Sequence, residues 1–186
     1  MRKVTYAALV FGWLLASNAY AQAPWSANTA TGVPNFQSTG VIKTMTVDAT
    51  VHGRGVRPRM TSEGFGTSFL YIPVTAPNNN TFACIGLRAM DNTTAGLVRA
   101  EFYRQPRNSN PGPAVLLGAV NTVDVVAPAD GFQFQQAPFG AVVINYSLYT
   151  YYIRLIMTHQ GAATALVPSV IALDVSLTPN CQTGGI

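Results

Sequence analysis

Apolar and polar positions alternate most clearly between residues 145 and 159. The positions on one side of an extended chain are Tyr149, Tyr151, Ile153, Leu155 and Met157, and those on the other are Thr150, Tyr152, Arg154 and Thr158. A period of two is typical of a half-buried β-strand. Aromatic and β-branched residues dominate this stretch, and neither Gly nor Pro interrupts it. We therefore expect a central strand against which other strands pair.

Shorter runs with β-type composition recur along the rest of the chain and are separated by turn-forming residues. They predict strands at 41–51, 67–72, 82–89, 97–104, 114–120 and 170–177, while 132–135 is either a short strand or an ordered loop. No helical period of useful length occurs beyond the first residues. This pattern predicts an all-β fold: a single antiparallel β-sandwich, jelly-roll-like, with about eight strands.

An outer-membrane barrel is the alternative architecture, because eight strands suffice to close one. The last predicted strand is followed by Pro179 and Cys181, and the strands lack paired aromatic girdles. Both features favour the sandwich.

Three segments carry a resemblance to known proteins: 97–104 (LVRAEFYR), 149–155 (YTYYIRL) and 169–175 (SVIALDV). Their alternation and spacing resemble a strand series in uncharacterised secreted bacterial β-sandwich proteins of jelly-roll-like form. The resemblance covers the C-terminal half of the chain. It implies a sandwich fold and brings no activity or site residues.

The first 21 residues predict a signal peptide. Arg2 and Lys3 form a positive start, an apolar run follows, and residues 19–21 (AYA) supply a cleavage site. The apolar run is about ten residues long, too short to cross ~30 Å of hydrocarbon as a helix. We expect export to the periplasm, cell surface or medium, with no membrane embedding after cleavage. The remaining chain divides into an N-terminal arm at 22–39, a β-sandwich domain at 40–181 and a short C-terminal tail at 182–186.

The chain contains two cysteines, Cys84 and Cys181. In an exported protein, an isolated pair predicts a disulfide. Such a bridge closes a loop of roughly 100 residues, for which the chain-entropy model gives ~4–5 kcal/mol of stabilisation.

Charged residues make up only 10% of the chain, against ~25% in a typical soluble domain. Loss of Arg2 and Lys3 with the signal leaves nine basic and seven acidic residues, a net charge of +2. So small a charge gives no argument for a nucleic-acid partner. Weakly charged sheet surfaces favour self-association or contact with a cell-surface polymer. The leading hypothesis is a secreted, non-catalytic structural, adhesive or surface-assembly module.

Arginines and surface tyrosines support an alternative hypothesis, a glycan-binding module. Arg54, Arg57 and Arg59 lie close together among Gly and Pro residues, which predicts an arginine loop able to bind anionic groups. Tyr103, Tyr152 and Arg154 lie on the polar sides of their predicted strands. Exposed tyrosine rings there would offer a stacking platform for sugars.

Catalytic and metal-binding motifs are missing from the sequence. The seven acidic residues are scattered, and no H-x-H, H-E-x-x-H or C-x-x-C occurs. We therefore expect no catalytic residues, metal or cofactor. A glycan-cleaving jelly-roll enzyme, which needs two carboxylates across a cleft, stays a third hypothesis.

Overall fold

A computed structural model describes residues 23–40, 42–48, 55–60, 64–91, 96–108, 112–122, 132–161 and 170–182. The predicted signal peptide and Arg54 lie outside these ranges. The strands are β1 (Trp25–Asn28), β2 (Val33–Gly40), β3 (Ile42–Asp48), β4 (Gly55–Met60), β5 (Gly64–Pro73), β6 (Thr81–Asp91), β7 (Leu97–Pro106), β8 (Val115–Asn121), β9 (Phe132–Val143), β10 (Tyr149–Gly161) and β11 (Val170–Thr178). A 3-10 helix, η1 (Thr29–Thr31), joins β1 to β2.

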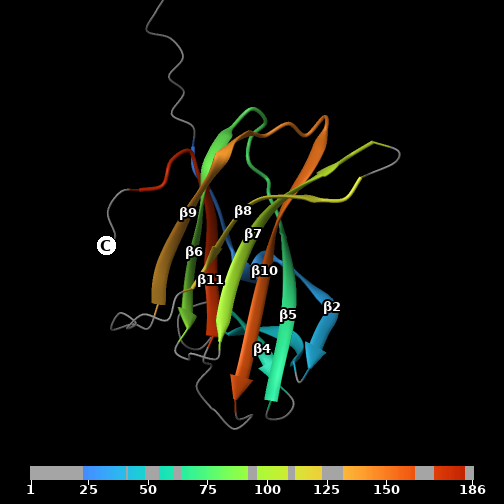
Figure 1. The fold of residues 1–186 in the computed structure, drawn as a ribbon, viewed down its shortest axis with the longest axis vertical. Helices are drawn as coiled ribbons and strands as arrows, with labels where there is room; N and C mark the ends of the chain where they lie inside the picture. Colours follow the sequence, from blue (N-terminus) through green and yellow to red (C-terminus); the bar gives the residue numbers. More distant parts are fainter. Residues whose placement is uncertain are drawn as a thin grey trace, which may run out of the picture.

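The strands form two antiparallel sheets packed face to face (Figure 1). One sheet has the order β3-β4-β11-β6-β9, with β1 also paired to β11, and the other has the order β2-β5-β10-β7-β8. The predicted jelly-roll-like sandwich is confirmed. The described residues contain eleven strands, where the sequence pattern indicates about eight.

The strand expected to be central, β10, lies between β5 and β7 and pairs with each along most of its length. Tyr151, Ile153, Leu155 and Met157 are buried between the sheets. The strand begins at Tyr149 rather than at residue 145. Residues 145–148 form a turn, in which the amide of Tyr149 donates to the Asn145 carbonyl at 3.0 Å.

The core fills the space between the two sheets. Its largest fully buried side chains come from both layers: Phe82, Phe102, Leu70, Ile72, Ile85, Leu87, Ile144, Ile153, Leu155, Met157 and Leu177. Trp25 of β1 joins this core, and its indole Nε1 donates to Thr75 Oγ1 at 3.3 Å.

Strand β8 contacts β9 and so joins the two sheets along one side of the sandwich. Gly118 permits this approach, because a Cβ there would lie 2.7 Å from Phe139. The Phe139 ring in turn packs against the ring of Phe102, with the two ring centroids 5.6 Å apart.

Two segments have more regular structure than their composition indicates. Residues 25–28, within the expected N-terminal arm, form β1, which pairs with β11. Residues 33–40, which run from the arm to the first residue of the expected domain, form β2, which pairs with β5. The expected arginine loop is corrected in part: Arg57 and Arg59 lie in β4, opposite Thr46 and Thr44 of β3. Gly and Pro suggested a loop, but the sheet accepts Pro58 opposite Met45.

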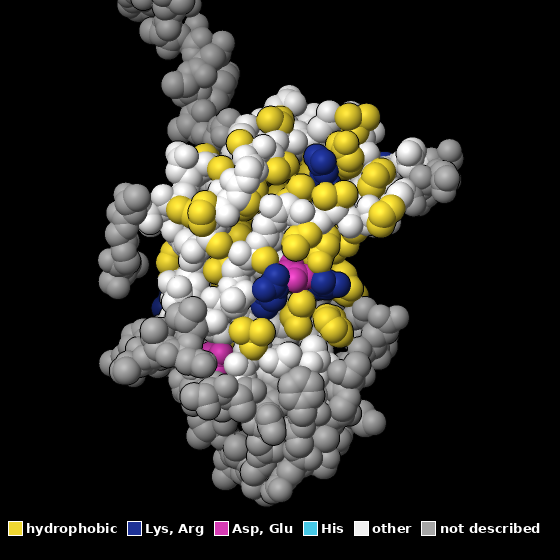
Figure 2. All heavy atoms as spheres, viewed as in Figure 1, with side chains coloured by type: hydrophobic (Ala, Val, Ile, Leu, Met, Phe, Trp, Pro, Cys, Tyr) yellow, Lys and Arg dark blue, Asp and Glu magenta, His cyan; other side chains and the backbone are white. Residues whose placement is uncertain are grey.

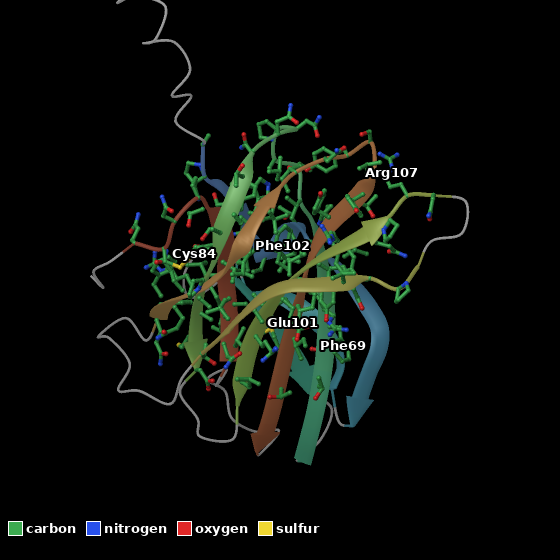
Figure 3. All side chains as sticks on the ribbon, turned by 45° about the horizontal axis from the view of Figure 1, so that its top comes forward. Phe69, Cys84, Glu101, Phe102 and Arg107 are labelled. Atoms are coloured by element: carbon green, nitrogen blue, oxygen red, sulfur yellow. A yellow bond between two sulfur atoms is a disulfide. The ribbon has the colours of Figure 1, made fainter. Side chains whose placement is uncertain are left out.

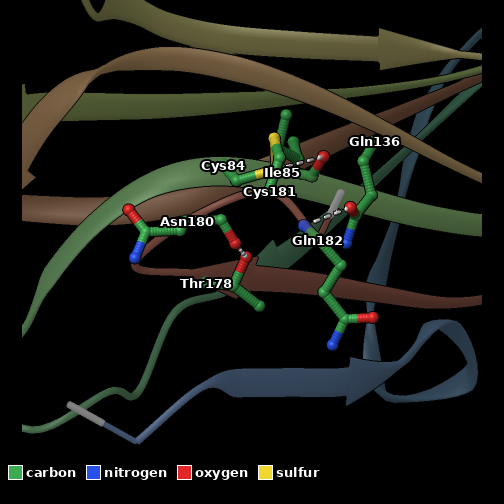
Figure 4. The surroundings of a disulfide bond; sticks show 7 residues. All are labelled: Cys84, Ile85, Gln136, Thr178, Asn180, Cys181 and Gln182. Carbon is green, nitrogen blue, oxygen red and sulfur yellow. Dashed lines mark hydrogen bonds between the residues drawn. A yellow bond between two sulfur atoms is a disulfide. The ribbon is translucent and has the colours of Figure 1, made fainter. Parts of the chain in front are cut away.

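The predicted disulfide between Cys84 and Cys181 is confirmed (Figure 4). Cys84 is fully buried in β6, opposite Thr178 of β11, and Cys181 follows β11. The amide of Gln182 donates to Gln136 Oε1 of β9 at 2.9 Å. The bridge therefore fixes the end of the described chain to the six-stranded sheet.

Replacing both cysteines with alanine should lower the free energy of unfolding by about 3–5 kcal/mol, because the bridge closes a long loop in the unfolded chain. Urea unfolding of the double variant beside the oxidised protein measures this loss. An unchanged unfolding midpoint would contradict a stabilising role for the bridge.

Candidate functional site

The outer face of the five-stranded sheet carries side chains in rows that run across the strands. Strand register places Tyr152 between Pro73 and Tyr103, and places Tyr103 opposite Leu116. The next row contains Val33, Tyr71, Arg154, Glu101 and Ala119, and the third contains Phe69, Ile156, Arg99 and Asn121. We use the name outer cluster for seven of these residues: Phe69, Tyr71, Arg99, Glu101, Tyr103, Tyr152 and Arg154.

An acidic side chain is visible on one face of the molecule (Figure 2). Figure 2 shows it flanked by basic side chains and bordered by hydrophobic ones. Figure 3 labels Glu101 and Phe69 on this sheet, with Arg107 near the far end of β7. In this view, most of the described surface around it is apolar or uncharged (Figure 2).

Glu101 is the centre of a hydrogen-bond network that spans β7 and β10. Arg99 Nε donates to Glu101 Oε1 at 2.7 Å, and Arg154 Nε donates to Oε2 at 2.9 Å. The Tyr103 hydroxyl also donates to Oε2 at 2.9 Å and accepts a 2.6 Å bond from Arg154 Nη2. Arg99 Nη1 reaches Asn121 Oδ1 on β8 at 3.1 Å. Both carboxylate oxygens are therefore engaged.

This network decides the charge of Glu101. Burial raises the pKa of the carboxyl, but hydrogen bonds from Arg154, Arg99 and Tyr103 outweigh burial and hold the pKa below its usual value. Glu101 is thus an anion at neutral pH. The general acid of a glycosidase needs a raised pKa, so Glu101 is not suited to donate a proton in that reaction.

Three tyrosines lie side by side on the same face. The rings of Tyr103 and Tyr152 stack with centroids 5.4 Å apart, and Tyr71 lies 5.6 Å from Tyr152 at a tilted angle. Burial raises the pKa of Tyr103 and of Tyr152, and the hydrogen bond to Glu101 adds to the rise at Tyr103. Both phenols therefore stay neutral and keep their hydroxyl protons. All three side chains are partly exposed.

The Arg154 guanidinium links the charged and aromatic parts of the outer cluster. Its Cζ lies 4.9 Å from the centroid of the Tyr103 ring and 6.0 Å from that of Phe69. These are cation–π distances. Arg154 thus forms a salt bridge with Glu101 and cation–π contacts with two aromatic rings.

The structure brings together only some of the site residues that the sequence indicates. It brings Tyr103, Tyr152 and Arg154 into contact, since they lie on the paired strands β7 and β10. Arg57 and Arg59 lie in β4 of the other sheet, and Arg54 lies outside the described residues. The outer cluster is thus built without the expected arginine loop.

Sequence reasoning missed four members of the outer cluster: Phe69, Tyr71, Arg99 and Glu101. A signal was present for two, because Arg99, Glu101 and Tyr103 occupy alternate positions of one predicted strand. Their significance depends on Arg154, which belongs to a strand about 50 residues later and becomes a neighbour only through pairing.

In the part of the chain that the structure describes, no three His, Cys, Asp or Glu side chains lie close enough together to hold a metal ion. None of the helices in that part is both long and apolar enough to span a bilayer.

The Glu101→Gln substitution should lower the free energy of unfolding at neutral pH by about 1–3 kcal/mol. A buried partner of two guanidinium groups is lost, and the partial exposure of both arginines limits the cost. Because the folded-state pKa of Glu101 is lowered, its contribution is present above the unfolded pKa and is lost as pH falls through the folded pKa. The stability difference from the unsubstituted protein should therefore shrink on acidification.

Urea unfolding at several pH values measures this difference. The matched control is Asp174→Asn, since burial raises the pKa of Asp174 and neutralising it should not destabilise the protein at neutral pH. A Glu101→Gln effect that is absent, or independent of acid pH, would contradict the network.

The fold is similar to that of several solved carbohydrate-binding domains at low sequence identity. The C-terminal CBM6 of the marine laminarinase LamC from Zobellia galactanivorans is 10% identical, with a TM-score of 0.46, over 84% of this chain and 99% of that one. The tandem CBM22 domains of Xyn10C from Paenibacillus barcinonensis are 9% identical, with a TM-score of 0.47, over 89% and 52%.

A family 11 carbohydrate-binding module from Clostridium thermocellum, in complex with a mixed-linked tetrasaccharide, is 9% identical, with a TM-score of 0.41, over 83% and 88%. No family model and no curated protein matches the sequence. At these similarities no ligand or binding residue of those proteins is assigned to this chain.

Proposed function

We propose that the protein is an exported, non-catalytic module that binds glycan through the outer cluster. The observation that carries the proposal is the group of partly exposed tyrosines held in register beside fixed hydrogen-bonding groups. A sugar ring has an apolar face of C–H groups and a rim of hydroxyls. Aromatic rings suit the first, and guanidinium, carboxylate and amide groups suit the second.

The side chains of the outer cluster hold one another in place by hydrogen bonds. Tyr103 is held by Glu101 and Arg154, and Arg99 is held by Glu101 and Asn121. All of these side chains stand on paired strands rather than on loops. Binding therefore immobilises few additional groups, which lowers its entropic cost.

The low charge and the sandwich fold also agree with the adhesive or surface-assembly role that the sequence favours. Binding a glycan of a cell surface would give the module such a role without a second site. We therefore treat adhesion as a consequence of glycan binding, and export by the predicted signal as its setting. The Cys84–Cys181 disulfide fits an oxidising compartment.

The Tyr152→Ala substitution should weaken glycan binding about fivefold or more, because loss of a central aromatic contact typically costs over ~1 kcal/mol. Affinity electrophoresis measures retention in gels containing dextran, galactomannan, mixed-linked β-glucan, polygalacturonate, alginate or dextran sulfate.

Phe134→Ala is the matched control, because Phe134 is an exposed aromatic on β9 of the other sheet. It should leave retention unchanged. If none of the six polysaccharides retards the unsubstituted protein, or both variants lose binding equally, the proposed function fails.

A further inference from the structure

We infer that the glycan bound by the outer cluster is acidic and that Arg99 and Arg154 bind its anionic groups. This inference rests on the proposed function and names its ligand class. The charges of the outer cluster are Arg99, Arg154 and Glu101. Among the described residues of β5, β7, β8 and β10, strand register places no further acidic side chain on this face. The charges of the outer cluster therefore sum to one positive unit.

Solvent exposure adds to this positive charge, because the two arginines are more exposed than Glu101. The side chains of Arg99 and Arg154 are 35% and 31% exposed, whereas that of Glu101 is 7% exposed. A ligand that approaches the sheet thus meets guanidinium groups first. Guanidinium forks bind carboxylate and sulfate oxygens with charge-assisted hydrogen bonds.

Glu101 sets the spacing of the two cations. Arg99 binds one carboxylate oxygen and Arg154 the other, so the guanidinium groups lie on opposite sides of the carboxylate. Glu101 also neutralises one of their two charges, and it competes with a ligand anion for their N–H groups. Gln keeps the shape of this side chain and one acceptor oxygen, so we expect Glu101→Gln to retain much of this positioning while removing the competing charge.

The rings around Arg154 complete the recognition of an acidic sugar. Tyr103 and Phe69 contact its guanidinium, and Tyr152 stacks on Tyr103 in the adjacent row. Successive rows lie about 6.6 Å apart, since they are two residues apart along a strand. A sugar on the tyrosines thus lies next to a cation that can reach its acidic substituent.

The test compares binding of the disulfide-bonded protein to dextran, polygalacturonate and dextran sulfate by affinity electrophoresis at low and high salt. We expect retention by the acidic polymers, weakened by salt, and little retention by dextran. Polygalacturonate and dextran sulfate separate carboxylate recognition from sulfate recognition, and retention by either one supports an acidic ligand.

Three substitutions test which charged residues bind the acidic glycan. Arg99→Gln should weaken acidic-glycan binding about threefold to tenfold, and Arg107→Gln, which removes the same charge from the far end of β7, should not. Glu101→Gln should strengthen it severalfold despite its lower stability, because a competing anion is removed. Circular dichroism confirms that each variant is folded.

The sign of the Glu101→Gln effect separates this inference from a purely structural network. A structural role predicts equal or weaker binding in that variant, and this result would overturn the inference. Salt-insensitive retention by dextran that depends on Tyr152 would overturn it while leaving the proposed function intact. Retention by no polysaccharide would overturn both.

Discussion

The alternation of side chains along β10 fixes which residues lie in the core and which lie on the outer face. β10 is hydrogen-bonded to β5 on one side and to β7 on the other, so its backbone cannot rotate or slip by one residue without inverting both faces. Tyr151, Ile153 and Leu155 are consequently fixed in the core. The intervening Tyr152 and Arg154 are fixed on the outer face, where Tyr152 stacks on Tyr103 and Arg154 binds Glu101.

A protein with so few charges has concentrated three of them in one network. The Glu101 carboxylate is nearly removed from solvent, which is unfavourable unless it is paired and fully hydrogen-bonded. Two arginines and a tyrosine meet that requirement. The same bonds orient the Tyr103 ring against Tyr152. Order in the aromatic part of the site is therefore a consequence of satisfying one buried charge.

The fold was largely predictable from the sequence, because strand alternation, turn residues and an isolated cysteine pair are local signals. The β10 strand, the sandwich class and the Cys84–Cys181 bridge illustrate this. The sequence does not indicate β4, because its Gly and Pro residues are typical of a loop, whereas pairing with β3 stabilises the strand. Tertiary pairing overrides such local preferences.

The candidate site was only partly predictable. Tyr103, Tyr152 and Arg154 were identified as outward-facing, but nothing local places the strand 97–104 beside the strand from Tyr149. Tyr71 and Phe69 come from a third strand, β5. Arg57 and Arg59, whose close spacing in the sequence indicates a site, belong to the other sheet. Sequence proximity was thus a weaker guide to the site than shared sheet position.

Binding of ligand to the outer face of the five-stranded sheet can be located by NMR, from amide chemical shifts during titration with a retained oligosaccharide. We expect the largest shifts in β5, β7 and β10, around Tyr71, Tyr103 and Arg154. Shifts confined to β4, β6 and β11 of the six-stranded sheet would contradict it.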